Sequence, residues 1–153
     1  MAQTTVEGIE GVQSIVGQHM GYSDWVTITQ EQVNQFAEAT NDHQWIHVDP
    51  ERAKAESPFG GPIAHGYLTL SLIIPMYSEV LTVTDAKMGV NYGLNKVRFP
   101  APVPVGAKVR LTATLKDVEE VAGGLQVTIA GVIEAEGGST PVCIAEPDFR
   151  VYG

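Results

Sequence analysis

The least polar stretch of the chain lies in its middle, between Ile63 and Met76, and it constrains the fold more than any other feature. It is shorter than the roughly 20 residues that a membrane-spanning helix requires, and it carries His65 and, near its end, Pro75. An apolar segment of this kind has to be covered by the rest of the protein. We therefore expect a buried core helix here and no association with a membrane.

After about residue 85, apolar and polar residues alternate. Residues 108–115 show the two-residue period of a half-buried strand. The pattern returns in residues 125–129 after a turn at Gly123-Gly124, and again from Val142 after Gly137-Gly138. Short turns between alternating strands predict an antiparallel meander.

Helix signals come before the apolar segment. Thr29 and Gln32 form a T-x-x-Q capping box, and the helix that it begins should stop near Asn41-Asp42. A second helical turn is predicted at Asp49-Pro50, and residues 57–62 form a turn-rich loop. Helices followed by a sheet predict an α+β fold, with residues 1–153 as a single domain.

Charge and composition narrow the possible functions. The net charge of −9 excludes the basic footprint of a duplex-binding protein, so we expect no nucleic-acid partner. Hydrophobic residues make up 44% of the chain, which excludes intrinsic disorder. Charged residues make up only 18%, below the roughly 25% of an average soluble protein, which hints at a surface hidden against another subunit.

Several kinds of site lack support in the sequence. A lone cysteine, Cys143, excludes an internal disulfide framework, and its strand pattern favours a small core residue over a nucleophile. Ser71 and Ser78 lack the G-x-S-x-G motif of serine hydrolases, and no dinucleotide or P-loop motif is present. Residues 1–18 do not read as a signal peptide, so we expect a cytoplasmic protein.

The densest polar cluster spans residues 41–49 and contains Asp42 and His47. On a continuous helix these two side chains would point about 140° apart, but a chain break after the first helix allows a loop to bring them together. A carboxylate and an imidazole that share one water form a general acid–base pair. In the alternative interpretation, Asp42 caps a helix end and His47 is an ordinary half-buried histidine.

The same cluster raises the possibility of a metal site. His43 and His47 are four residues apart, and Asp42, Asp49 and His65 are further possible ligands. The two histidines would face the same way only on an unbroken helix, and the glutamate of a metalloprotease helix is missing. We therefore expect no metal.

The segment Gly61-Pro62-Ile63-Ala64-His65-Gly66-Tyr67 opens the apolar helix. The N–H groups at a helix start have no acceptor within the helix, and a glycine lets a substrate carbonyl approach closely. The N–H of Gly66 is thus a candidate oxyanion-hole donor. Alternatively, Gly66 only permits close packing of the helix on the sheet.

These two features together resemble the MaoC-like, (R)-specific enoyl-CoA hydratase/dehydratase family. The family pattern of an acidic residue, four further residues and a histidine is matched within residues 36–47, and its Pro-Ile-x-His-Gly pattern is matched at 62–66. Residues 23–29 and 91–99 look particularly like those of the small actinobacterial members.

The resemblance implies a hot-dog fold, an antiparallel sheet wrapped around one long central apolar helix, paired as a homodimer. It implies that Asp42 and His47 activate the water that is added across a trans-2-enoyl-CoA double bond, giving a (3R)-hydroxyacyl-CoA, and catalyse the reverse dehydration. The N–H of Gly66 would then polarise the thioester carbonyl. No metal or redox cofactor is implied, since CoA is part of the substrate.

The chain departs from the family pattern in the loop between the two acid–base residues. Asn41 stands where glycine is common, Gln44 replaces asparagine, and Trp45 replaces proline. We expect Gln44, Trp45 and His65 to orient the loop or to line the substrate pocket. The bulk of Trp45 bears on the preference for acyl chains and not on the type of reaction.

Coenzyme A is polyanionic, so an acidic protein that binds it needs a local basic patch. Lys96 and Arg98 are the candidates for this contact with the phosphates, and Lys87, Lys108 and Arg110 are rivals.

Three other functions stay open at this point. A hot-dog thioesterase would hydrolyse the same class of substrate. A binding module for acyl thioesters would keep the fold without activity. A metal-dependent hydrolase would lose its activity on chelation.

Overall fold

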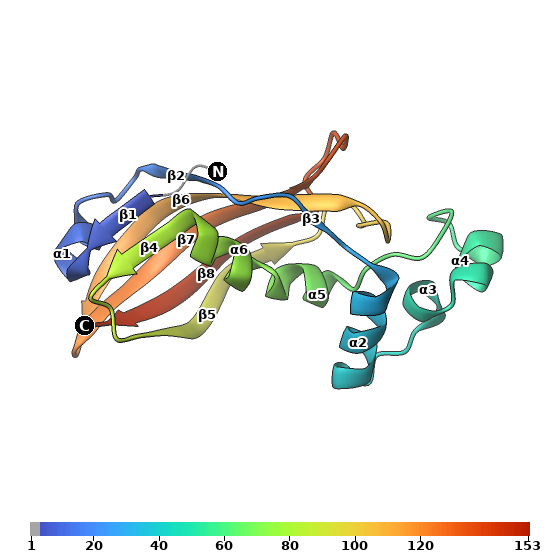
Figure 1. The fold of residues 1–153 in the computed structure, drawn as a ribbon, viewed down its shortest axis with the longest axis horizontal. Helices are drawn as coiled ribbons and strands as arrows, with labels where there is room; N and C mark the ends of the chain where they lie inside the picture. The colour runs from blue at the N-terminus through green and yellow to red at the C-terminus, as the bar shows by residue number, and fades with distance from the viewer. Residues whose placement is uncertain (1–3) are drawn as a thin grey trace.

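The computed structural model describes residues 4–153, in which a curved antiparallel sheet wraps around a helical segment (Figure 1). The strand order is β2-β6-β7-β8-β5, and the short β3 also pairs with β6. This is the α+β hot-dog arrangement that the resemblance implied. The strands are β2 (His19–Tyr22), β3 (Val26–Thr27), β5 (Met88–Arg98), β6 (Lys108–Val121), β7 (Gly124–Ala135) and β8 (Cys143–Tyr152).

The predicted antiparallel meander is confirmed as β6, β7 and β8. On β6, Val109, Leu111 and Leu115 are fully buried, while the side chains between them are half-exposed. The alternation follows from the pleat, which turns successive side chains to opposite faces of the sheet. The buried face of the meander therefore forms one wall of the core.

The predicted core helix is confirmed, although its bounds differ and it has two segments, α5 (Gly66–Ser71) and α6 (Ile73–Val80). Leu72 separates them, and its N–H is shared between the carbonyls of Leu68 and Thr69. Pro75, in the first turn of α6, has no N–H to offer to Ser71 and would clash with its carbonyl in an unbroken helix. Proline here interrupts the helix without ending it.

Three further helices lie together beyond one end of the sheet (Figure 1): α2 (Gln30–Thr40), α3 (Trp45–Val48) and α4 (Pro50–Glu56). The predicted caps are confirmed, since Thr29 accepts the N–H of Gln32 and Asp49 accepts that of Arg52. Helix α2 ends where Asn41 adopts a left-handed conformation, with φ of 63°. Asparagine tolerates this conformation, so the chain reverses just before Asp42.

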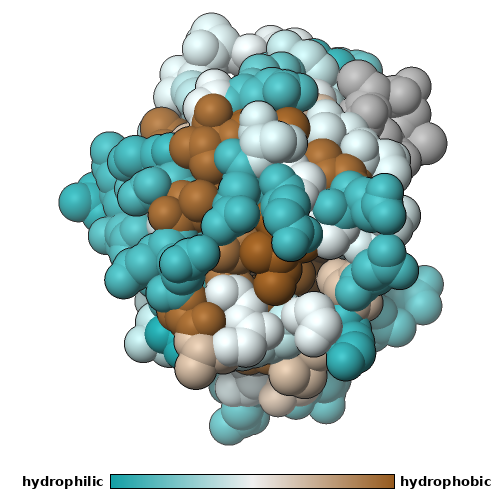
Figure 2. All heavy atoms as spheres, turned by 90° about the vertical axis from the view of Figure 1, so that its left-hand side faces the viewer, coloured by the Kyte–Doolittle hydropathy of each residue, from teal (hydrophilic) through white to brown (hydrophobic). Residues whose placement is uncertain are grey.

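The opposite end of the sheet is closed by segments that the sequence did not predict. Strands β1 (Thr4–Glu7) and β4 (Leu81–Thr84) pair in parallel, and α1 (Gly8–Gln13) follows β1. Val6, Ile9 and Val83 pack there against the core. Figure 2 shows apolar side chains gathered among polar ones on this end of the molecule. Within residues 4–153, no helix is both long enough and apolar enough to cross a membrane.

The edge strand β5 was also not predicted. It pairs with β8 through two register shifts, between Asn91 and Gly93 and between Leu94 and Val97. All of its side chains except that of Val97 are exposed. The strand leads directly to Phe99, which lies at the functional site described next.

Candidate active site

Asp42 lies in the loop between α2 and α3, and its position follows from the way α2 ends. The left-handed Asn41 turns the chain away from the helix axis. The carboxylate of Asp42 then accepts the main-chain N–H of Gln44 at 3.4 Å, a long hydrogen bond. Because Asp42 is exposed, its carboxylate is accessible to a ligand.

His47 lies in the short helix α3 and is buried, with 7% of its surface exposed. Its Nδ1 lies 2.7 Å from the carbonyl oxygen of Ile63. A carbonyl only accepts hydrogen bonds, so Nδ1 carries the proton in the neutral ring and Nε2 keeps its lone pair. The backbone is held as well, because Gln30 donates from Nε2 to the carbonyl of His47 at 2.8 Å. His47 is thus fixed with Nε2 as its basic atom.

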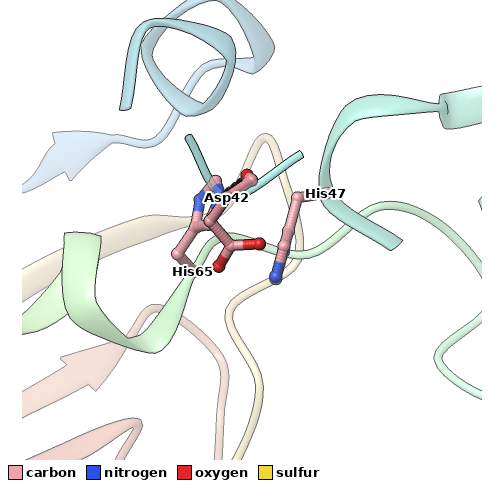
Figure 3. A group of neighbouring side chains, drawn as sticks. All are labelled: Asp42, His47 and His65. Carbon is pink, nitrogen blue, oxygen red and sulfur yellow. Dashed lines mark hydrogen bonds between the residues drawn. The ribbon is translucent and has the colours of Figure 1, made fainter. Parts of the chain in front are cut away.

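The structure brings Asp42, His47 and His65 together (Figure 3). One carboxylate oxygen and one ring nitrogen from each histidine all lie within 4.8 Å of one another. The break after α2 permits this arrangement, as expected from the sequence. The alternative, in which Asp42 only caps a helix end, does not account for its closeness to two buried imidazoles.

His65 is the most enclosed of the three, with 2% of its surface exposed. Its Nε2 lies 3.0 Å from the main-chain carbonyl oxygen of Asp42 (Figure 3). Its ring stacks on that of His47, with 4.0 Å between the centroids and 23° between the planes. The ring of Phe36 lies 4.8 Å away. His65 therefore contacts both of the proposed acid–base residues.

Burial lowers the pKa of His47 below its ordinary value of 6.5, because the charged imidazolium loses solvation. The hydrogen bond to Ile63 and the negative charge of Asp42 oppose this effect, while the neighbouring His65 adds to it. The outcome is a neutral imidazole near pH 7, as a general base requires.

Two cavities adjoin these residues and share His47, Gly66 and Phe99. The first, of about 340 Å³, is the polar one, and Asp42, His65 and Tyr67 complete its lining. The second, of about 310 Å³, is lined further by Phe59, Ile63, Ala64, Thr69, Val142 and residues 100–103. An elongated ligand with one apolar end and one polar reacting group fits this combination.

Gly66 is the first residue of α5, so its N–H has no acceptor within that helix. A Cβ atom at this position would lie 3.1 Å from Cε2 of Phe99. Glycine therefore lets Phe99 close over the helix start, as the packing interpretation predicted. The same residue lines both cavities, as the oxyanion interpretation requires.

Gln44 and Trp45 were expected, together with His65, to orient the loop or to line the substrate pocket. Gln44 is the residue before α3, and its main-chain N–H contacts Asp42. Trp45 packs its ring against Arg52, whose guanidinium carbon lies 4.3 Å from the ring centroid. Among the described residues, neither Gln44 nor Trp45 lines the two cavities.

Lys96 and Arg98, the candidates for the CoA phosphates, both lie exposed near the end of β5, just before Phe99. The guanidinium of Arg98 donates to the neighbouring carbonyl of Val97. The rival Arg110 is engaged elsewhere, since it pairs with Glu134 at 2.6 Å. Its guanidinium also lies over the rings of Tyr22 and Trp25.

The possible metal ligands make other contacts or do not converge. The exposed His43 lies 3.7 Å from Glu38 and Asp49 caps α4, so both serve other contacts. One nitrogen of His47 and one of His65 face carbonyl oxygens, and the two rings stack almost in parallel. Nitrogen lone pairs in stacked planes do not converge on a common point as metal ligands at roughly 2 Å must. The geometry favours acid–base chemistry.

The weaker candidates for a nucleophile have structural roles. Ser71 and Ser78 donate to the carbonyls of Tyr67 and Pro75 within the central helix. Burial raises the pKa of the Cys143 thiol to about 11, so it is not ionised at neutral pH.

Sequence reasoning missed two residues of the site. Phe99 lies in a segment that was noted only for its resemblance, and nothing in its spacing indicated a contact with Gly66. Gln30 follows the cap residue of α2, where a glutamine usually signifies only a solvated helix face. Tertiary contacts, which sequence periodicity does not encode, place both residues beside His47.

The chain is similar in sequence to one known family and to proteins of known name. The family profile described as "MaoC like domain" matches residues 11–137. The 3-hydroxyacyl-thioester dehydratase Z of Mycobacterium tuberculosis is 54% identical over 147 residues, which are 95% of this chain and 97% of that protein. Nodulation protein N of Rhizobium meliloti is 45% identical over 139 residues, 90% of this chain and 86% of that protein.

Solved structures share the fold. The (R)-hydratase of A. caviae involved in PHA biosynthesis has a TM-score of 0.71 and 25% identity, covering 88% of this chain and 94% of that one. A 3R-hydroxyacyl-ACP dehydratase complex of Mycobacterium tuberculosis has a TM-score of 0.65 and 20% identity, covering 89% of this chain and 96% of that one.

Proposed function

The chain belongs to the family of MaoC-like domains, and from this premise we propose that it interconverts 3-hydroxyacyl thioesters and 2-enoyl thioesters. The observation that carries the proposal is the approach of the Asp42 carboxylate to a neutral His47 at a cavity. The dehydratase that is 54% identical to this chain supports the same reaction. The similarity to an (R)-hydratase supports the 3R configuration.

In the hydration direction, Asp42 and His47 bind one water molecule between them. Nε2 of His47 accepts a proton from the water as its oxygen bonds to C3 of the enoyl thioester. The electron pair of the double bond moves toward the thioester carbonyl, and the acid–base pair returns one proton to C2. The hydration product thus gains one water in total, and dehydration follows the same path in reverse with the release of one water.

The N–H of Gly66 completes this proposal as the oxyanion-hole donor. It is the first donor of the central helix and lies between the two cavities that share His47 and Phe99. A donor aimed at the thioester oxygen stabilises the enolate-like transition state more than the ground state. The apolar cavity then accommodates the acyl chain.

Coenzyme A is the proposed carrier, and Lys96 and Arg98 are the proposed contacts for its phosphates. Both side chains precede Phe99, so they lie on the strand that leads to the cavities. We expect Lys96→Ala and Arg98→Ala to raise KM for a CoA thioester. KM for a pantetheine thioester, which lacks the nucleotide, should not change. Equal effects on both substrates would contradict the assignment.

We propose that the reaction needs no metal or redox cofactor. We also propose that the protein assembles as a homodimer and that residues 1–153 form one domain. The 3R-hydroxyacyl-ACP dehydratase of the same fold is itself a complex.

Incubation with crotonyl-CoA tests the reaction directly. Hydration removes the enoyl absorbance without releasing a free thiol, whereas a thioesterase would release CoA. A binding module would show neither change, and a metal-dependent hydrolase would lose its activity after chelation. Release of free CoA as the main reaction would overturn the proposal.

Variants of the acid–base pair test the site. Asp42→Asn and His47→Gln should each lower kcat by about 10²- to 10⁴-fold, since each removes one proton-transfer group. His43→Gln is the matched control, because His43 is an exposed histidine of the same loop that lies 3.7 Å from Glu38 and lines neither cavity. Wild-type turnover by both site variants would refute the assignment.

A further inference from the structure

We propose that His65 is a positioning residue that holds the loop of Asp42 in place beside the imidazole of His47. The inference rests on the proposed function and assigns the buried histidine of the second motif a defined part in it. His65 also lines the polar cavity, but the role proposed here is exerted through the two residues that it contacts.

The first contact is the hydrogen bond to the loop. Since a carbonyl only accepts, Nε2–H of His65 donates to the main-chain oxygen of Asp42 at 3.0 Å. The loop has few other restraints at this point, because Asp42 is exposed and its hydrogen bond with Gln44 is long, at 3.4 Å. The bond from His65 thus ties the carboxylate-bearing residue to the core.

The second contact is the stacked ring. The imidazole of His65 contacts two rings, that of His47 with 4.0 Å between the centroids and that of Phe36 with 4.8 Å. With 2% of its surface exposed, it has no room to rotate away. One rigid ring therefore sets the distance between the main chain of Asp42 and the imidazole of His47.

The backbone of His65 adds a third link. It is the N-cap of α5, and its carbonyl accepts the N–H of Thr69 at 3.2 Å and the hydroxyl of Thr69 at 3.3 Å. The next residue is Gly66, the proposed oxyanion donor. A single residue thus joins the acid–base pair to the start of the central helix.

The remaining nitrogen shows that this histidine serves more than packing. Nδ1 of His65 is buried and has no hydrogen-bond partner among the described residues. An unsatisfied buried nitrogen costs stability, and an apolar ring would avoid that cost. A histidine here is explained by its Nε2–H donor.

Two substitutions separate the donor from the ring. His65→Phe keeps a ring for stacking and removes the donor, whereas His65→Gln keeps a donor at the position of Nε2 and removes the ring. We expect His65→Phe to lower kcat for crotonyl-CoA by about 10- to 100-fold with little change in KM, because displacement of a catalytic group by an ångström has this effect. His65→Gln should retain more activity than His65→Phe.

His19→Phe is the matched control, since His19 lies on β2 with its ring nitrogen against Thr112. It should keep the wild-type kcat. A folded His65→Phe with wild-type kcat, in a protein that Asp42→Asn inactivates, would overturn the inference and leave the proposed function intact. Loss of kcat in His19→Phe would also count against it.

A second measurement needs no activity, so it decides the question even if the proposed function fails. The titratable groups that face His47 are Asp42 on the preceding loop and His65 before α5, and His65 lowers the pKa of His47. NMR titration of the His47 ring should therefore show a higher pKa in His65→Gln. Hydrogen exchange of the Gln44 amide should be faster in His65→Phe. An unchanged pKa together with unchanged exchange would overturn the inference.

Discussion

Nε2 of His47 is the atom on which the proposed chemistry depends. Its neighbour Nδ1 is committed to the carbonyl of Ile63, so the ring has one orientation and one free lone pair. Gln30 holds the backbone of the same residue through its carbonyl. A general base needs this restriction, because proton transfer is efficient only at hydrogen-bond distance and in the right direction.

The pH dependence of the reaction follows from the burial of this ring. His47 has to be neutral to accept a proton, and its pKa lies below 6.5. In hydration, kcat/KM should be constant around neutral pH and should fall only below pH 6.5. A pH profile with crotonyl-CoA checks this. An acid limb above pH 6.5 would contradict the neutral-base assignment.

Stability should respond to pH in the same direction. Below pH 6.5 the unfolded chain binds a proton at His47 that the folded chain does not yet bind, so stability rises with pH in this window. The contribution of His47 is complete above 6.5 and is lost as pH falls toward the lowered pKa. The difference between the wild type and His47→Gln in chemical denaturation isolates this contribution.

Gly66 gives a third prediction at this scale. The methyl group of Gly66→Ala would meet the ring of Phe99 at 3.1–3.3 Å, so the ring has to move. Alanine favours a helix interior by about 1 kcal/mol over glycine, and at the first residue of α5 a part of this gain offsets the contact, so stability should change little. Because Phe99 lines both cavities, kcat/KM should fall by about tenfold.

The shorter side chain of Phe99→Leu should relieve this contact. The double variant should therefore lose less activity than the sum of the two single losses. Additive losses would show that Gly66 does not act through Phe99.

At the residue scale, the sequence predicted Asp42 and His47, which carry the proposed chemistry, and the neighbouring His65, but it missed Phe99 and Gln30. Asp42 and His47 were identified because a carboxylate and an imidazole beside a helix break form a local pattern. Phe99 and Gln30 reach the site from distant parts of the chain, and an ordinary phenylalanine or glutamine carries no local signal of such a contact.

At the scale of the elements, Asp42 and His47 lie after or within short helices, and the termini of these helices determine where the two residues lie. Helix α2 begins at the cap residue Thr29 and ends at the left-handed Asn41, directly before Asp42. Gln30, the first residue of α2, holds the carbonyl of His47 in α3. The start of α2 therefore contributes to the stability of the domain and to the geometry of the site.

Thr29→Ala tests this contribution. It removes the acceptor for the N–H of Gln32, and the free energy of unfolding should fall by about 1 kcal/mol. Chemical denaturation measures the loss. Thr29→Ser keeps the hydroxyl and should stay within a few tenths of a kcal/mol of the wild type. An equal loss in both variants would show that the cap is not its source.

Among the elements, helix caps and alternating strands were predicted well because both are local patterns. The interruption at Leu72 was not predicted, since a proline ends one helix and is tolerated in the first turn of another. Strand β5 was missed although Val90, Tyr92 and Leu94 alternate with glycine and asparagine. These two residue types favour turns, and they obscured the strand pattern.

At the scale of the whole molecule, the sheet has an open edge at β5. It is the last strand in the order β2-β6-β7-β8-β5, so one side of its backbone is unpaired within residues 4–153. Met88 is 54% exposed, Tyr92 58% and Leu94 47%. Natural proteins cover or interrupt long apolar edges of this kind. The low charged fraction of the chain, 18%, agrees with such a covered surface.

A second copy of the chain suits this edge better than an unrelated partner. Two β5 strands related by a two-fold axis can pair in antiparallel fashion and extend the sheet, because each supplies the same unpaired backbone groups. Leu94 also borders a hollow of about 250 Å³ against Leu70 and Ile74 of the central helix. In the proposed homodimer, the partner covers this hollow and steadies the strand that leads to Phe99.

A charged substitution on β5 tests this assembly. Leu94→Lys places a charge on the edge, so we expect it to convert the dimer into a monomer, as measured by size-exclusion chromatography with light scattering. Activity should fall when dimerisation is lost, because β5 leads to the wall of both cavities. Val16→Lys is the matched control, since Val16 is 43% exposed and lies outside β5. It should stay dimeric and active, whereas a monomeric wild type or a dimeric Leu94→Lys would exclude pairing through β5.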